Sequence, residues 1–355
     1  MPLVAAAALV AAGLGSTTAG GTPPAAGAVF TGRLPDGAPL EDDSARAVEA
    51  LAAQAGYTRD STPVAGYYPR GYNTVIKESA FSVPVYTVGR DQPTSTVIWV
   101  DEDGTPQPPG AAHDLQSTFD EVPVPLDIPQ LQADGSDGHL VVHQPSTDTL
   151  WEFWRFSASA DGDERFTAGY GARIRPWSTS SGVLLHQWGA RATSLDLLGG
   201  VMRMQDYGRG VFPYALTMAL PVIDDRVVAP ATRTDGPSAA TPSQDMRHAL
   251  SAGMKFRLPA GYDCDALRED GGAEERLLRM ICVAARDYGI VVSDRSGGTV
   301  TMYAEDDRTV GTSYSEVETS PWPSVSRAFS GPDAVLPDFP WDDLQLLRAA
   351  SPGDV

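Results

Sequence analysis

Catalytic or binding chemistry could begin at Glu152, which lies among aromatic residues on a predicted strand. Residues 149–156 read Thr-Leu-Trp-Glu-Phe-Trp-Arg-Phe and follow a turn at 144–149. Because side chains of a strand alternate between its two faces, Glu152 and Trp154 share one face. A carboxylate beside large aromatic rings suits contact with a sugar or another flat polymer. The same pattern also fits a β-sandwich core beside one solvated glutamate, and both interpretations stay open here.

Two further carboxylates are candidates for catalysis together with Glu152. Asp206 comes just before a predicted strand, and Asp294 follows a buried strand in the turn Ser-Asp-Arg-Ser-Gly-Gly. Glycoside hydrolysis uses two carboxylates, one of which has a raised pKa. The chain has 46 acidic residues, and an Asp in such a turn commonly caps its own backbone. Two of these carboxylates about 5–10 Å apart in a groove would favour hydrolysis, whereas scattered carboxylates beside an exposed aromatic strip would favour binding.

A second set of candidates could contact the substrate without reacting. These residues are aromatic rings that could stack on a sugar, and one arginine that alternates outward on its strand: Trp154, Trp177, Trp188, Tyr170, Tyr214 and Arg173. Most tryptophans in a sheet belong to the core, so each ring has an ordinary structural explanation as well.

The sequence argues against a metal site and against a cofactor. His139 and His143 are four residues apart, about 13 Å along a strand, too far for two ligands of one metal. Two cysteines and five scattered histidines do not make a zinc-ligand set. Neither a Gly-x-Ser-x-Gly elbow nor a dinucleotide-binding glycine motif is present in a suitable setting. We therefore expect no metal and no cofactor.

The charge balance excludes further classes of partner. The 355-residue chain has 46 acidic and 26 basic residues, a net charge of −20, and only two lysines. Such a chain is unsuited to a nucleic-acid backbone and to anionic lipid. An acidic surface is typical of a soluble extracellular protein. Residues 1–15 resemble the apolar core of a signal peptide without its positively charged start, and no other apolar run is long enough to span a membrane.

Cys264 and Cys282 lie 18 residues apart, and two interpretations are open. They could close one disulfide, which would stabilise the fold by roughly 3 kcal/mol. Cys282 also lies in an apolar helical stretch, where a buried free thiol is common.

The elements that must position these residues are mainly short strands. With 35 glycines and 29 prolines, the chain favours many turns over long helices. We expect at least eight strands, at 81–88, 96–100, 139–143, 149–156, 165–175, 210–220, 253–258, 289–293 and 300–304. Helices are predicted at 44–54 and 273–287. The prediction is an all-β jelly-roll or β-sandwich with two peripheral helices, in one domain at 41–350 after an Ala-, Gly- and Pro-rich arm or degenerate signal segment at 1–40.

Several ordered segments resemble a family of uncharacterised secreted actinobacterial proteins, and similar modules of actinobacteriophage minor tail proteins. The resemblance covers roughly residues 80–345 and rests on segments such as Asp-Gly-His-Leu-Val-Val-His at 137–143, Gly-Tyr-Gly-Ala-Arg-Ile at 169–174, Ala-Arg-Ala-Thr-Ser-Leu-Asp at 190–196, Pro-Ala-Thr-Arg-Thr-Asp-Gly at 230–236, Gly-Met-Lys-Phe-Arg-Leu-Pro at 253–259 and Phe-Pro-Trp-Asp-Asp-Leu-Gln at 339–345. Where the family carries His-Ala-Leu after an acidic residue, this chain has Pro213-Tyr214-Ala215-Leu216, with Asp206 at the acidic position. Catalysis through that histidine is therefore not expected here.

The resemblance and the residues together lead to three alternatives. The first is an extracellular or virion tail module that recognises cell-envelope polysaccharide, with other tail proteins as further partners. The second is a glycoside hydrolase or lyase that acts on actinobacterial cell-wall glycan. The third is a purely structural minor tail protein.

Overall fold

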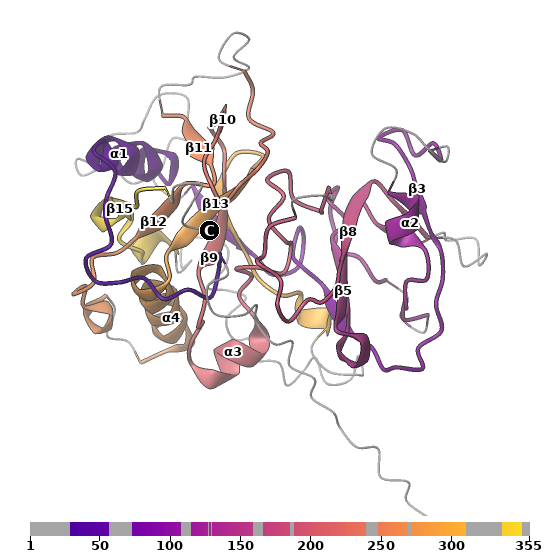
Figure 1. The fold of residues 1–355 in the computed structure, drawn as a ribbon. Helices are drawn as coiled ribbons and strands as arrows, with labels where there is room; N and C mark the ends of the chain where they lie inside the picture. Colours follow the sequence, from indigo (N-terminus) through magenta and orange to yellow (C-terminus); the bar gives the residue numbers. More distant parts are fainter. Residues whose placement is uncertain are drawn as a thin grey trace, which may run out of the picture.

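A mixed six-stranded sheet forms one side of the molecule in a computed structural model (Figure 1). The structure describes residues 29–56, 73–107, 115–126, 128, 130–158, 166–184, 188–238, 248–267, 271–309 and 336–349. The strand order of this sheet is β1-β14-β9-β13-β12-β15. Its strands are Thr74–Lys77 (β1), Leu216–Leu220 (β9), Lys255–Arg257 (β12), Ile290–Arg295 (β13), Val300–Tyr303 (β14) and Gln345–Leu346 (β15). We call this sheet and the helices packed on it the first lobe.

The other side of the molecule, the second lobe, contains a four-stranded and a three-stranded sheet (Figure 1). The four-stranded sheet has the order β2-β4-β5-β8 and the other has the order β3-β7-β6. Their strands are Val85–Thr87 (β2), Val97–Trp99 (β3), Leu140–Gln144 (β4), Thr149–Trp154 (β5), Ser157–Ala158 (β6), Phe166–Ala168 (β7) and Tyr170–Ile174 (β8). A separate pair, Ile223–Val227 (β10) and Leu250–Ala252 (β11), lies near α1 of the first lobe.

Four α-helices accompany these sheets in the described part of the chain: Ser44–Gln54 (α1), Gln116–Phe119 (α2), Met204–Arg209 (α3) and Ala273–Asp287 (α4). Short 3₁₀ turns occupy Pro145–Thr147, Cys264–Ala266, Asp307–Thr309, Leu336–Asp338 and Trp341–Asp343. The predicted helices at 44–54 and 273–287 are confirmed, and so is the β-rich character of the fold. The described residues include no helix that is both long enough and apolar enough to cross a bilayer.

The pairing of the strands differs from a simple succession of hairpins. Five pairs in the described part of the chain are parallel, namely β1 with β14, β9 with β13, β2 with β4, β3 with β7, and β10 with β11. The stretch predicted as one strand at 165–175 divides at Gly169 into β7 and β8, which belong to different sheets. These pairings do not by themselves establish a jelly-roll or β-sandwich arrangement.

Buried apolar side chains form three groups, of which two lie within the lobes and one lies between them. The largest packs α1 and α4 on the six-stranded sheet, through residues such as Leu51, Ile281 and Val292. A second lies within the second lobe and includes Phe119 and Phe153. The third contains side chains from the four-stranded sheet together with residues of β9 and β14, so it joins the two lobes.

The predicted arm is partly described. Residues 1–28 lie outside the described residues. Within 29–40, Phe30 is buried at 1% exposure, and its carbonyl accepts a hydrogen bond from Ala215 N at 2.6 Å. This part of the predicted arm therefore packs on the first lobe.

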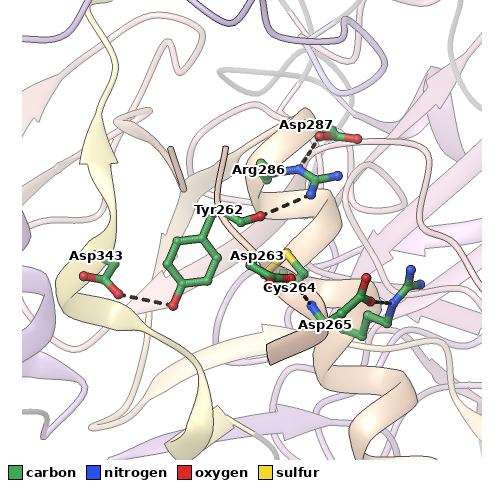
Figure 2. The surroundings of a disulfide bond; sticks show 9 residues. Tyr262, Asp263, Cys264, Asp265, Arg286, Asp287 and Asp343 are labelled. Atoms are coloured by element: carbon green, nitrogen blue, oxygen red, sulfur yellow. Dashed lines mark hydrogen bonds and ion pairs between the residues drawn. A yellow bond between two sulfur atoms is a disulfide. The ribbon is translucent and has the colours of Figure 1, made fainter. Parts of the chain in front are cut away.

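Cys264 and Cys282 form a disulfide with an S–S distance of 1.98 Å, which decides between the two interpretations (Figure 2). The bond ties the loop before α4 to the buried face of that helix. Nearby, the Tyr262 hydroxyl hydrogen-bonds Asp343 Oδ2 at 3.2 Å, and Arg286 Nη1 donates to the Tyr262 carbonyl at 3.3 Å. The loop, α4 and the C-terminal turn of the described chain are thus held as one unit in the first lobe.

Candidate functional site

Glu152 lies in the interior between the two lobes rather than on the surface. It occupies β5, and its exposed fraction is 0%. One carboxylate oxygen accepts the N–H of Ala190 at 2.7 Å, and the other accepts the N–H of Leu197 at 2.6 Å. The side chain therefore fastens the segment 188–200, which we call the covering loop, to the four-stranded sheet.

Gly189 permits this close approach of the covering loop. Its φ is +53°, in the left-handed region that favours glycine. A Cβ at this position would lie 3.0 Å from Glu152 Oε1 and 2.6 Å from Leu184 Cδ1. Any larger residue would push the loop away from the carboxylate.

Arg191 is the cation at the centre of the buried charges. Its side chain is 1% exposed. Nη1 donates to the carbonyls of Asp196 and Gly199 at 3.1 and 2.9 Å, and Nη2 donates to Thr217 Oγ1 on β9 at 3.0 Å. Arg191 therefore ties the covering loop to the first lobe.

Asp294 faces Arg191 from β13. Its Oδ2 lies 4.0 Å from Arg191 Nε, and its Oδ1 accepts the N–H of Ala192 at 3.2 Å. The sequence had placed Asp294 in a turn that caps its own backbone, but the residue belongs to the strand and binds the covering loop instead. Glu152, Arg191, Asp294 and Asp196 form what we call the buried charge cluster.

Burial favours the neutral forms of these acids. Desolvation raises the pKa of Glu152 to about 8, and the Asp196 carboxylate contributes to the same shift. Desolvation also raises the pKa of Asp196 to about 6. The pKa of Asp294 is raised well above its usual range by burial and then by Asp235. Arg191 opposes all three shifts but does not outweigh the loss of solvation.

Asp206 belongs to a different cluster, on α3. Its Oδ2 accepts the Tyr214 hydroxyl at 2.9 Å, and its Oδ1 lies 3.2 Å from Arg209 Nη1. Burial raises the pKa of Asp206 and Tyr214 alike. In the described part of the chain, neither Tyr214 nor Arg209 forms a hydrogen bond or ion pair with Glu152 or Asp294. The three candidate acids therefore divide between two clusters.

Three half-buried rings form an aromatic strip at the end of the four-stranded sheet. Trp154 of β5 lies directly across from Tyr170 of β8, with ring centroids 5.8 Å apart and an interplanar angle of 36°. Trp188 of the covering loop continues the series, 5.6 Å from Tyr170 and tilted by 33°. We call Trp154, Tyr170 and Trp188 the aromatic strip.

An arginine lies over each end of the strip. The Arg233 guanidinium is 4.0 Å from the Trp188 ring centroid, and Arg233 Nη2 donates to the Trp188 carbonyl at 3.0 Å. At the other end the Arg155 guanidinium lies 5.3 Å from the Trp154 ring. These cation–π contacts order the rings and add hydrogen-bond donors beside them.

The remaining predicted contact residues lie elsewhere. Trp177 is 2% exposed and packs edge-on against His143, and Tyr214 is 5% exposed and donates to Asp206. Arg173 is half-buried on β8 opposite Trp151, on the face of the sheet that points away from Glu152. The structure thus brings Trp154 and Trp188 together with Tyr170, but not with these three.

Both histidines considered for a metal site are buried. His139 Nδ1 lies 3.2 Å from the Ser82 carbonyl, and the His143 ring lies 4.8 Å from Trp177. Over the described ranges, no three or more His, Cys, Asp or Glu side chains are grouped so as to hold a metal ion.

No family model, curated protein or solved structure matches this chain. The chemistry open to the site therefore follows from its own geometry. Glu152 is closed off from solvent and both its oxygens are bonded to backbone N–H groups. The aromatic strip, in contrast, is partly open and combines ring faces with arginine donors, an arrangement suited to holding a ligand.

Sequence reasoning missed four contributors: Arg155, Arg191, Asp196 and Arg233. Arg191, Asp196 and Arg233 lie within two of the sequence segments noted above, at 190–196 and 230–236. These segments were the only sequence feature that drew attention to the three residues. They gave no indication that the two segments meet at the aromatic strip and the buried charge cluster.

Proposed function

We propose that this protein recognises cell-envelope polysaccharide without turning it over, and that it acts outside the cell or on a virion tail. The observation that carries the proposal is the aromatic strip of Trp154, Tyr170 and Trp188, with rings spaced 5.8 and 5.6 Å apart and an arginine over each end.

The strip suits a sugar chain for two chemical reasons. A sugar ring presents C–H groups on its faces, which pack on an aromatic face, and hydroxyls on its rim, which need hydrogen-bond partners. The guanidinium groups of Arg155 and Arg233 lie at the ends of the strip and supply such partners. Rigid, half-buried rings also lose little conformational freedom when a ligand binds.

Hydrolysis is the weaker alternative because of where the acids lie. A pKa of about 8 would suit Glu152 as a general acid, but the side chain has 0% exposure and a catalytic acid must reach the glycosidic oxygen. Asp206 instead hydrogen-bonds Tyr214 and pairs with Arg209, and it does not belong to the buried charge cluster. If no glycan binds, a purely structural role in a virion tail becomes the better account.

The compartment is part of the proposal. A disulfide between the only two cysteines is typical of proteins exposed to oxidising surroundings. The net charge of −20 and the family resemblance point the same way. The jelly-roll or β-sandwich architecture stays a prediction.

Binding to purified actinobacterial arabinan, galactan and peptidoglycan tests the proposal. The wild type should bind at least one of them, and Trp188→Ala should weaken that binding at least tenfold, about 1.4 kcal/mol. Tyr262→Ala, which removes a half-buried ring beside the disulfide, is the matched control and should bind like the wild type. No binding to any of the three would reject the proposal. Release of reducing ends by the wild type would support the hydrolase instead.

A further inference from the structure

A cavity of about 410 Å³ lies on the second lobe next to the aromatic strip. Its walls come from the turn after β3, from the segment 130–138, and from residues 155–157 with Thr167 of β7. The volume falls in the range of small-molecule sites, roughly 300–1,000 Å³. Polar side chains that line it include Asp101, Gln130, Gln132, Asp134 and Arg155.

Arg155 belongs to both the cavity and the strip. Its guanidinium lies over Trp154 and its side chain lines the cavity. The residue has a φ of +55°, a left-handed conformation that strains any non-glycine residue. Its N–H donates to the Asp137 carbonyl at 2.7 Å and Nη2 donates to the Glu102 carbonyl at 2.7 Å, so it is held in this position from two sides. Arg155 is therefore shared between the cavity wall and the end of the aromatic strip.

Gln132 supplies an acceptor that the described protein does not satisfy. The residue lines the cavity, and its Oε1 is buried without a hydrogen-bond partner among the described residues. Buried polar groups in proteins are almost always hydrogen-bonded. Rotation of the Gln132 amide toward the cavity would bring this oxygen to a ligand hydroxyl, which would complete it.

The charges of the cavity favour a neutral ligand over an anion. The lining residues include two carboxylates, Asp101 and Asp134, and one guanidinium, that of Arg155, while Arg308 Nη1 lies 3.9 Å from Asp134 Oδ2. Asp101 is already committed to its own turn, since it accepts the N–H groups of Asp103 and Thr105 and the amide of Gln107. Asp134 Oδ1 accepts from Gln130 Nε2 at 2.5 Å, and its side chain is 59% exposed. Donor hydroxyls suit these acceptors, whereas a carboxylate or phosphate would add negative charge beside two carboxylates.

We propose that this cavity binds one neutral sugar unit of the glycan that lies along the aromatic strip. The proposal rests on the proposed function and adds the class of sugar and its place. Arg155 marks the boundary between the unit in the cavity and the unit stacked on Trp154.

Thr167→Phe tests the assignment, because the larger side chain would fill the cavity from β7. The control is Thr96→Phe, at an exposed position just before β3 that does not line the cavity. The probes are galactotetraose, arabinotetraose and tetragalacturonate, titrated calorimetrically into each folded variant. Thr167→Phe should weaken binding of the better neutral probe at least tenfold, while Thr96→Phe binds like the wild type. The acidic probe should bind at least tenfold more weakly than that neutral probe.

Gln132→Met is a second variant that keeps the shape of the side chain and removes the unpaired oxygen. It should fold normally and bind the neutral probe several-fold more weakly. Wild-type affinity in both Thr167→Phe and Gln132→Met, with binding still lost in Trp188→Ala, would overturn the cavity assignment alone. Tighter binding of the acidic probe would also overturn it. Absence of binding by the wild type would overturn the proposed function together with this inference.

Discussion

Glu152 and Trp154 lie two residues apart on the same face of β5, yet they serve opposite purposes in the structure. The covering loop closes over Glu152, so the carboxylate is bonded to backbone N–H groups in the interior. The covering loop does not bury Trp154. Its first residue, Trp188, packs beside Tyr170 and extends the aromatic strip. One strand face thus passes from the buried charge cluster to the partly open aromatic strip.

The difference lies in burial, because the Glu152 carboxylate is fully enclosed whereas the rings of the aromatic strip are half-buried. The acids here have pKa values of the kind found at active sites, but desolvation produces those values without access to a substrate. We therefore expect changes in the buried charge cluster to reduce stability, and changes in the strip to reduce affinity. The free energy of unfolding of single variants measures this division.

Removal of the buried cation should have the largest effect. Arg191→Leu leaves the carbonyls of Asp196 and Gly199 and the Thr217 hydroxyl without their buried donor, and each such loss typically costs about 1–3 kcal/mol. Urea denaturation at pH 7 measures the change. Arg226→Leu is the control, since Arg226 is 69% exposed and its ion pair with Asp224 should contribute about 1 kcal/mol or less. Equal losses in the two variants would contradict a structural role for the buried cluster.

Glu152→Gln should have the next largest effect. Both oxygens of Glu152 accept backbone N–H groups, whereas the glutamine NH₂ can only donate, so one N–H of the covering loop loses its partner. We expect a loss of roughly 1–3 kcal/mol, read from denaturant unfolding. Glu49→Gln on the exposed side of α1 should change little. A Glu152→Gln protein as stable as the wild type would show that the carboxylate does not fasten the loop.

The free energy of unfolding should also depend on pH through the Glu152 carboxyl. The native pKa of Glu152 is about 8 and its ordinary value is 4.5, so the native state binds a proton that the unfolded state has lost. Stability must then fall as pH rises through this range, by at most about 1.4 kcal/mol per pH unit. His143 has the opposite sign, since its pKa is lowered from 6.5 to about 4 and stability rises with pH between those values.

The informative window is therefore pH 6.5 to 8, above the range in which His143 contributes. Denaturation at three pH values in this window should show a falling stability in the wild type and a flatter profile in Glu152→Gln. A stability that rises with pH there would contradict the assigned protonation of Glu152.

Trp188→Ala should have the smallest effect on folding. It removes one ring pair and one cation–π contact at a half-buried position, which together amount to about 1 kcal/mol. Its loss of glycan affinity should exceed this change. Thermal denaturation beside the binding measurement makes the comparison, and a loss of several kcal/mol would place Trp188 with the structural residues.

Local patterns predicted the elements that depend on local sequence. The apolar spacing and flanking residues of 44–54 and 273–287 correspond to α1 and α4 because a helix satisfies its own backbone. Short strands such as β1, β10, β11 and β15 were not predicted, since their stability comes from partners far along the chain. The polar run Ile-Asp-Asp-Arg-Val of β10 has no alternation that would indicate a strand.

The same limit applies to the candidate site. Alternation along β5 correctly places Glu152 and Trp154 on one face, because that geometry is local. The covering loop that buries Glu152 lies 38 to 45 residues further along the chain. Neither the position of the covering loop nor the buried charge cluster can be derived from a strand pattern. The burial of Trp177 and Tyr214 likewise depends on long-range packing.

The contact between the first helix and the last strand bears on how the chain folds during synthesis. The Ser44 hydroxyl of α1 accepts the N–H of Leu346 on β15, across 302 residues, and Glu41 N donates to the Leu346 carbonyl at 3.0 Å. A pairing between residues 41–44 and Leu346 cannot form until the chain has been synthesised past Leu346. The apolar face of α1 therefore stays without this partner while the segment between them is made.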